Sequence, residues 1–286
     1  MIYPYLLPES DGLPTRPSGL WATEKLDYLR RYIDVFETSM RGKWPIRNYV
    51  DLQAGPGKIA LRETGEIRLG SPLLAITTEH PFTGYYFGDI EPENTAALLQ
   101  RTADSLVHER INIFTGDCNL LVHDIVTRLR EDESQSLNLA FLDPEGLEFQ
   151  WSSVMALASI RRMDLIINYP QSALTRYMPI AIANPSETSV DRFFGTEEWR
   201  NIYTQFQSGT QPNLHRHLID LYRSRLHDLG YSNIMRDDEV GDEPLMRNAQ
   251  RNAPLYRLIF ASKNPLGNEF WHKVTRRNVY GQRSLF

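Results

Sequence analysis

Four aspartates end short apolar runs of similar length and spacing. They are Asp51 in NYVD, Asp89 in YYFGD, Asp117 in INIFTGD and Asp143 in LAFLD. A short apolar run bounded by turn signals predicts a buried parallel strand. The carboxyl ends of such strands meet along one edge of an open sheet, where ligands bind. We therefore predict that the four carboxylates line one crevice and can accept hydrogen bonds from hydroxyl, amino or ammonium groups.

A glycine-rich turn, LQAGPGK, follows the first of these strands. Gly55 and Gly57 can adopt positive φ and let a ligand approach the main chain closely. The dinucleotide fingerprint G-x-G-x-x-G is absent, because Ala60 stands where its last glycine would be. The P-loop pattern is also absent, because Ile59 stands where a serine or threonine should follow the lysine. The turn therefore predicts a site for a cofactor other than a dinucleotide or a nucleoside triphosphate. The alternative is a turn that binds nothing.

Together, the turn and the strand ends predict a site for S-adenosylmethionine. Asp51 suits the ammonium group of its methionine part, and Asp89 suits the two ribose hydroxyls. Asp117 can accept from the adenine amino group, while the backbone N–H of Cys118 suits an adenine ring nitrogen. The predicted cofactor-binding residues are thus Asp51, Ala54, Gly55, Gly57, Asp89, Asp117 and Cys118. The alternative is that these acids only cap the helices that follow them.

The sequence DPEG at the end of the fourth strand is the candidate for catalysis. The Asp143 carboxylate and a following backbone carbonyl could accept hydrogen bonds from an amino group and aim its lone pair at a methyl donor. An acid followed by proline at this strand end is typical of amino-methyltransferases, although their commoner form has a second proline and an aromatic residue. We predict Asp143, Pro144 and Glu145 as catalytic residues; a purely structural turn is the alternative. Weaker candidates for substrate contacts are Lys25, Ser71, Arg176 and Lys263.

Alternating strand and helix patterns place these residues in an α/β protein with a doubly wound, mostly parallel, Rossmann-like sheet. We predict an irregular N-terminal arm at residues 1–22 and the cofactor-binding core at residues 23–170. Residues 171–230 predict a helical insertion after the fifth strand, either a cap over the crevice or a surface for a partner. Within residues 231–286, two strands at 231–237 and 255–262 predict an antiparallel closing pair that completes the sheet.

Composition limits the function further. The chain has 286 residues, one cysteine and a formal net charge of −5. A single cysteine excludes an internal disulfide and an iron–sulfur cluster built from this chain's thiolates, and the histidine spacing predicts no metal site. The negative charge means that a nucleic-acid site would be a local basic patch or would be shared with a partner. With no apolar run of membrane-spanning length and no secretory signal pattern, we predict a cytoplasmic protein.

The order of these motifs resembles the three-Cys-motif partner protein family, a group of bacterial methyltransferase-like proteins. The resemblance covers most of the chain and is carried by TEKL, DLQAGPG, GSPL, FGD, GDCN, FLDPEG, IINYP with Arg176, FFG with Trp199, LIFASK and Trp271. Members of the family more often read FAGPG and DPYG. Gln53 and Glu145 depart from those forms, and Glu145 adds an acid beside the predicted target site.

The resemblance implies a class I methyltransferase-like fold and a companion protein with three cysteines, of the kind that includes radical iron–sulfur enzymes. The leading hypothesis is an S-adenosylmethionine-dependent methyltransferase that acts on an amino group, such as that of a nucleobase in nucleic acid. The second hypothesis is a non-catalytic partner that docks and regulates the companion. A nicotinamide-dependent oxidoreductase is disfavoured because the dinucleotide fingerprint is missing.

Overall fold

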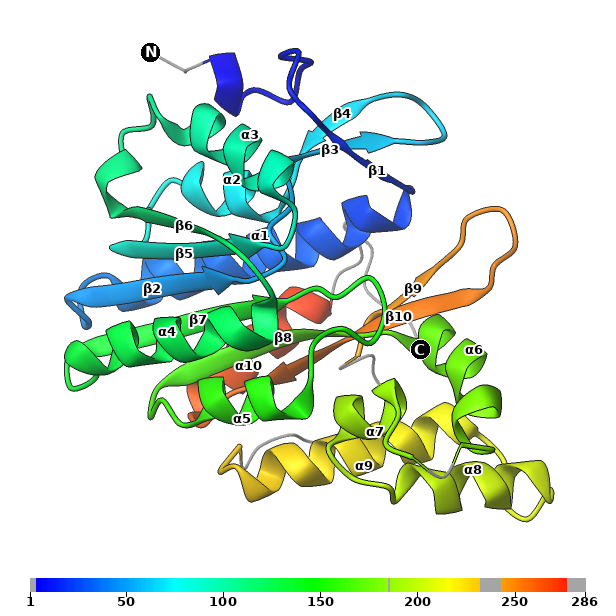
Figure 1. Cartoon of the computed structure of the whole chain (residues 1–286). Helices are drawn as coiled ribbons and strands as arrows, with labels where there is room; N and C mark the ends of the chain where they lie inside the picture. The colour runs from blue at the N-terminus through cyan, green and yellow to red at the C-terminus, as the bar shows by residue number, and fades with distance from the viewer. Residues whose placement is uncertain (1–3, 185, 232–242, 277–286) are drawn as a thin grey trace.

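The computed structural model describes residues 4–184, 186–231 and 243–276. Its centre is a seven-stranded sheet in the order β6-β5-β2-β7-β8-β10-β9 (Figure 1). The strands are β2 (Ile46–Asp51), β5 (Gly84–Asp89), β6 (Ile111–Thr115), β7 (Ser136–Leu142), β8 (Met163–Tyr169), β9 (Leu245–Arg247) and β10 (Pro254–Ala261). The first five are parallel to one another, while β10 runs antiparallel to both β8 and β9. The predicted methyltransferase-like Rossmann class, with its closing antiparallel pair, is confirmed.

The chain enters the sheet at its centre, because β2 lies between β5 and β7. It extends first to one side through β5 and β6, and then to the other side through β7 and β8 (Figure 1). The strand order therefore reverses at β2, and the loops after β2 and β7 diverge there to leave a crevice. Asp51 ends β2, and Asp143 directly follows β7, so both residues lie at this switch point.

Helices cover both faces of the sheet (Figure 1). One face packs on α1 (Trp21–Met40), α2 (Ser71–Ile76), α3 (Pro92–Thr102) and α10 (Pro265–Thr275), and the other on α4 (Cys118–Glu131) and α5 (Trp151–Ala158). Successive strand residues alternate between the two cores, since Tyr49 belongs to the first and Val50 to the second. The central strands β2, β7 and β8 are thus buried on both sides, which explains why they read as nearly continuous apolar runs. Short 3-10 turns occur at Pro4–Leu6 and His108–Arg110.

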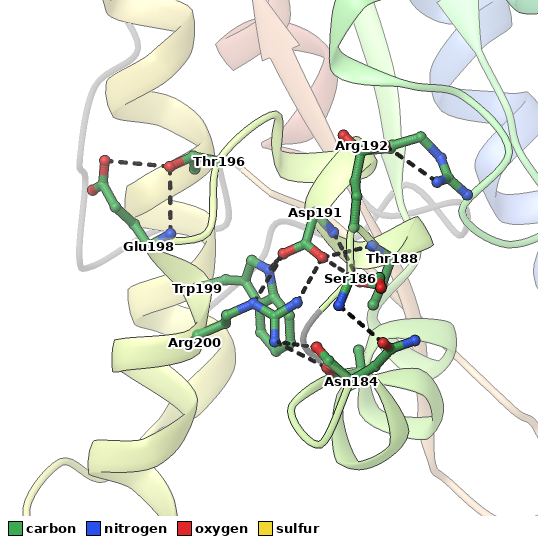
Figure 2. A network of polar contacts seen from close by, with 11 residues as sticks. Asn184, Ser186, Thr188, Asp191, Arg192, Thr196, Glu198, Trp199 and Arg200 are labelled. Atoms are coloured by element: carbon green, nitrogen blue, oxygen red, sulfur yellow. Dashed lines mark hydrogen bonds and ion pairs between the residues drawn. The ribbon is translucent and has the colours of Figure 1, made fainter.

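The predicted helical insertion follows β8. It consists of α6 (Gln171–Ala181), α7 (Ser189–Phe194), α8 (Trp199–Gln207) and α9 (Leu214–Asp228). Figure 2 shows the polar centre of this cap, where Asp191 joins α7 to α8. Its carboxylate accepts from Trp199 Nε1 at 2.8 Å and from Arg200 Nη2 at 2.7 Å, and it completes a capping box with Thr188. The network fixes the angle between two short helices that are too brief to be stable alone.

Two elements differ from the prediction. The arm at residues 1–22 contains β1 (Arg16–Ser18), which pairs in parallel with β3 (Lys58–Leu61), and β3 pairs with β4 (Ile67–Leu69) in a second, three-stranded sheet. Arg-Pro-Ser has no strand periodicity, so pairing with β3 rather than local propensity makes this strand. Of the strand predicted at 231–237, only residue 231 is described and it is not in a strand, whereas β9 lies in the segment predicted as a loop.

Across the described part of the chain, every helix is too short or too polar to cross a lipid bilayer.

Candidate functional site

A cavity of about 450 Å³ opens at the carboxyl edge of the sheet, at the switch point. Residues from the arm, the glycine turn, the β3–β4 hairpin, α1, the β7 end and α6 line it. Below, this cavity is called the crevice. It brings together nine of the predicted site residues: Lys25, Ala54, Gly55, Gly57, Ser71, Asp143, Pro144, Glu145 and Arg176. The predicted cofactor turn and the predicted catalytic loop are therefore walls of the same cavity.

The other predicted residues lie outside the lining of the crevice. Asp51 and Asp89 lie behind the glycine turn. The negative charges of Asp89 and Asp143 both raise the pKa of Asp51. Asp117 and Cys118 lie farther along the edge, where β6 passes into α4. Lys263 is not in this region at all. It lines a second cavity, of about 430 Å³, with Trp44 and Met163.

Asp51 is the buried acid of the site, with no exposed surface. Its Oδ1 accepts from the backbone N–H of Gln53 at 3.2 Å, whereas its Oδ2 is buried and has no hydrogen-bond partner among the described residues. Burial is the main reason that its pKa rises to about 7. The negative charges of Asp143 and Asp89 add to this, while the nearby Ser71 side chain and the backbone N–H of Gln53 oppose it. An orphaned carboxylate oxygen in such a place fits a cationic or N–H donor from a ligand.

The glycine turn has the positive φ values that its sequence predicts. Gly55 has φ of 62° and Gly57 has φ of 93°. A Cβ on Gly57 would lie 2.9 Å from Leu98 Cδ1 and 3.0 Å from Leu73 Cγ, so a side chain is excluded there by space as well as by backbone conformation. The bare main chain of the turn consequently forms one wall of the crevice.

Asp89 supports this turn from behind. Its Oδ2 accepts from the backbone N–H of Gly55 at 2.8 Å. Its Oδ1 accepts from the backbone N–H of Glu91 at 2.9 Å and from Asn94 Nδ2 at 3.0 Å. Only Oδ2 has acceptor capacity left, because a carboxylate oxygen takes about two hydrogen bonds. Asp89 therefore holds the turn in shape, and ribose binding by its remaining lone pair stays a prediction.

Asp143 is held from two sides at the end of β7. Lys25 Nζ, from α1, lies 2.5 Å from its Oδ2, and Asn168 Nδ2, from β8, donates to its Oδ1 at 2.8 Å. Asn168 Nδ2 also lies 3.4 Å from the carbonyl oxygen of Pro144. Asn168 was missed in the sequence, although a polar residue inside the otherwise apolar run LIINY is a signal that could have identified it.

Arg16 is a second residue of the crevice that the sequence did not reveal. Its Nε donates to Glu145 Oε1 at 2.9 Å, and its Nη2 forms an ion pair with the same carboxylate. Burial lowers the pKa of Arg16, but the nearby charges of Asp143, Glu145 and Asp89 outweigh it and raise that pKa. The second acid of DPEG is thus neutralised by a cation from the arm.

A buried ion cluster fastens the arm over the turn. Asp11 receives a two-pronged contact from Arg101, with Nε at 2.8 Å and Nη2 at 2.7 Å, and Lys58 Nζ lies 2.8 Å away. Arg101 Nη1 also donates to the carbonyl oxygen of Pro56 within the glycine turn. Burial would raise the pKa of Asp11, yet the hydrogen bonds from Arg101 and Lys58 hold it well below its usual range.

The region where adenine was predicted has an exposed apolar surface. Ile90, directly after β5, is 63% exposed, and Leu120, in the first turn of α4, is 71% exposed. Asp117 caps α4 by accepting from the backbone N–H of Asn119 at 2.7 Å. Burial raises the pKa of the Cys118 thiol to about 12, which excludes it as a nucleophile at neutral pH. These two exposed apolar side chains are suited to contact with a planar ring, a role that the sequence alone did not indicate.

Within the described ranges, His, Cys, Asp and Glu form no cluster of three or more that could hold a metal ion.

Comparisons with known proteins add little. No protein-family model matches the sequence, and no curated protein matches it. Among solved structures, the chain is similar to protein LPL1258 from Legionella pneumophila, with a TM-score of 0.38 and 14% identity over 57% of this chain and 74% of that chain. It is also similar to a Methanococcus maripaludis protein provisionally described as an S-adenosylmethionine-dependent methyltransferase, with a TM-score of 0.34 and 12% identity over 84% of this chain and 89% of that chain. Similarity at this level says nothing about chemistry, so the chemistry must come from the side chains of the crevice.

Proposed function

We propose that the protein is an S-adenosylmethionine-dependent methyltransferase that acts on an amino group. The observation that carries this proposal is the position of Asp143. It lies opposite the glycine turn in one cavity, oriented by Lys25 and Asn168, and the buried Asp51 with its orphaned oxygen stands behind that turn. Such an arrangement separates a cofactor wall from a wall that can receive a target group.

The glycine turn of the crevice and the residues behind and beside it fit S-adenosylmethionine. Asp51 Oδ2 would accept from the ammonium group, the bare backbone at Gly55 and Gly57 would approach the ligand, and Ile90 with Leu120 would flank the adenine ring. Asp89 would reach the ribose, and Asp117 with the Cys118 backbone N–H would reach the adenine edge. When bound, this cofactor supplies an electrophilic methyl group.

The residues of the other wall would position the acceptor. The Asp143 carboxylate, which pairs with the ammonium of Lys25, would accept a hydrogen bond from the target amino group. The Pro144 carbonyl, which Asn168 approaches at 3.4 Å, would accept a second one. These two contacts direct the nitrogen lone pair, and a proton lost from the methylated nitrogen can pass to the carboxylate.

The resemblance to the three-Cys-motif partner family leads us to include a companion protein in the proposal. With one cysteine, this chain cannot supply the thiolates of an iron–sulfur cluster, whereas a three-cysteine companion could. The cap is the surface proposed to meet it, because Tyr177, Ile180 and Phe206 are large apolar side chains exposed on α6 and α8.

A specific observation favours the second candidate function, a non-catalytic partner. Both acids of DPEG are already paired, Asp143 with Lys25 and Glu145 with Arg16. In an enzyme, the target amino group would have to use the acceptor positions that Lys25 and Asn168 leave on the Asp143 oxygens. A protein that only docks onto its companion needs no substrate contact there and could keep both pairs permanently.

Calorimetric titration with S-adenosylmethionine and S-adenosylhomocysteine tests the cofactor proposal. We expect micromolar binding that Asp51→Asn weakens at least tenfold, while Glu145→Gln, a matched change of an acid on the opposite wall, leaves it unchanged. Absence of binding to either ligand, with and without the companion, would refute the methyltransferase and leave the docking role.

Turnover tests the catalytic assignment. Methyl transfer to candidate acceptors should be measured with and without the companion, for wild type and for Asp143→Ala. We expect the variant to keep cofactor binding and to lose at least a hundredfold in kcat. Unchanged turnover with cofactor binding intact would remove Asp143 from the reaction.

A further inference from the structure

The crevice carries a charge opposite to that of the whole chain. Its lining contains five cationic side chains, Arg16, Lys25, Lys58, Arg62 and Arg176, and two carboxylates, Asp143 and Glu145. The protein as a whole has a formal net charge of −5. A cavity with a net positive lining raises the local concentration of negatively charged ligands.

Three of these cations are already neutralised. Lys25 pairs with Asp143, Arg16 pairs with Glu145, and Lys58 pairs with the fully engaged Asp11 of the arm. They hold the walls of the crevice together and are not available to a ligand without breaking an ion pair. The charge that a ligand meets is consequently that of the two remaining side chains.

Arg62 and Arg176 are the remaining two. Both are exposed, and no carboxylate among the described residues forms an ion pair with either of them. Arg62 Nη2 donates to the carbonyl oxygen of Pro17 at 3.2 Å, a neutral acceptor that leaves the charge of the guanidinium unpaired within the described part of the chain. Arg62 follows β3 of the small sheet and Arg176 belongs to α6 of the cap, so the two come from different walls of the crevice.

We propose that the acceptor is a single-stranded oligonucleotide, whose phosphates contact Arg62 and Arg176 while one base reaches Asp143. The planar guanidinium matches phosphate oxygens with two parallel hydrogen bonds, which makes arginine better suited than lysine to this contact. Pro170 and Ser172, at the start of α6, also line the crevice, so the N-terminal end of that helix favours an anion on the same wall.

The preference for a strand over a single phosphate follows from the origin of the two arginines, which belong to different elements that line the crevice. Guanidiniums on two walls suit consecutive phosphates of one strand better than a single phosphate. A single strand is favoured over a duplex because an amino group stacked and paired inside a duplex cannot reach a recessed carboxylate without being flipped out. The base assignment rests on the proposed methyl transfer at Asp143, whereas the phosphate contacts do not.

Fluorescence anisotropy with a labelled single-stranded RNA twelve-mer tests the proposal in the full chain between 50 and 200 mM salt. We expect Arg62→Ala and Arg176→Ala each to weaken binding about tenfold and to reduce the salt slope by about 0.7, the value for one phosphate contact on a single strand. The matched control is Arg68→Ala. Arg68 lies in the same small sheet but outside the crevice, and it is paired with Glu66. This control should leave affinity and slope unchanged.

Competition distinguishes the source of the phosphate. Inorganic phosphate and a nucleoside monophosphate should displace the twelve-mer only at concentrations far above those of unlabelled RNA. Equal potency of the mononucleotide would overturn the oligonucleotide and assign the arginines to a free nucleotide. Affinity that is unchanged in both crevice variants, or reduced as much by Arg68→Ala, would overturn the phosphate contacts themselves.

The two proposals can fail separately. If the RNA binds through Arg62 and Arg176 but calorimetry shows no S-adenosylmethionine binding, the phosphate site stands and the methyltransferase falls. If the cofactor binds and the RNA does not, the methyltransferase stands and the oligonucleotide acceptor falls.

Discussion

Replacing Asp11 with asparagine should destabilise the whole core, although the residue lies in an N-terminal segment with little regular structure. Its carboxylate joins the arm to Arg101 and Lys58, whose side chains have no exposed surface. The change removes one negative charge from between two buried positive charges and keeps the size of the side chain. The remaining cations then face each other without a counterion.

The magnitude follows from the burial of the partners. Removing one member of a buried ion pair costs about 3–5 kcal/mol, because the other member is left uncompensated. We expect the lower end, about 3 kcal/mol, because the asparagine oxygen can still accept one hydrogen bond. Arg101 also keeps its hydrogen bonds to the carbonyl oxygens of Pro14 and Pro56.

Urea unfolding at pH 7, followed by tryptophan fluorescence, measures the effect. With an m-value of about 3 kcal/mol/M for a chain of this size, the midpoint should fall by about 1 M. Glu66→Gln is the matched control, since it breaks an exposed pair with Arg68 that is worth at most about 1 kcal/mol. A loss for Asp11→Asn no larger than that of the control would refute the reasoning.

The same variant has a signed pH dependence. The pKa of Asp11 is lowered in the folded protein, so its stabilisation is complete above the unfolded value, near 4, and is lost as the pH falls further. The difference in free energy of unfolding between wild type and Asp11→Asn should therefore be constant from pH 7 to about pH 5 and should shrink below pH 4. A difference that grew on acidification would contradict the assignment of this carboxylate as the charged partner.

Three further predictions concern the turn, the thiol and the cap. Gly57→Ala should lower the free energy of unfolding by about 2–4 kcal/mol, measured by urea unfolding, because the new methyl group meets Leu98 at a positive φ. Cys118, with a pKa of about 12, should be ionised to only about one part in ten thousand at pH 8, so a disulfide reagent should modify it far more slowly in the native protein than in urea. Asp191→Asn should cost about 2–3 kcal/mol at pH 7; since the folded pKa is lowered to about 2, thermal unfolding should show this contribution disappearing between about pH 4 and pH 2.

The strands and their acidic ends were predictable because their signal is local. An apolar run that ends at Asp51, Asp89 or Asp143 needs only nearest-neighbour information, and buried parallel strands produce that run directly. The helical insertion was predictable for the same reason. By contrast, β1 depends on a partner strand more than forty residues away, and nothing in Arg-Pro-Ser indicates it.

The polar partners of the site could not be predicted because they are distant in the sequence. Lys25 and Asp143 are separated by 118 positions, and Asp11 and Arg101 by 90. The prediction of Lys263 as a substrate contact could have been avoided, however. Lys263 follows β10, which was predicted to be antiparallel, and the carboxyl end of an antiparallel strand lies at the amino edge of its neighbours. Topology alone therefore places Lys263 away from the crevice.

Some contacts of the arm stabilise the fold, and others set the charge of the crevice. The pair between Arg16 and Glu145 is of the second kind. Glu145 has a side chain that is 73% exposed and Arg16 one that is 30% exposed, so their attraction is screened by water. A double-mutant cycle with Arg16→Gln and Glu145→Gln should give a coupling below about 1 kcal/mol in the free energy of unfolding.

The cycle for Asp11→Asn and Arg101→Gln, read in the same way, should give a coupling several times larger because those groups are buried. Coupling of equal size in the two cycles would show that burial does not separate them. With the expected inequality, Asp11 anchors the arm, whereas Arg16 sets the charge beside Asp143. The acid that departs from the family pattern can then be balanced at the crevice with little effect on the stability of the fold.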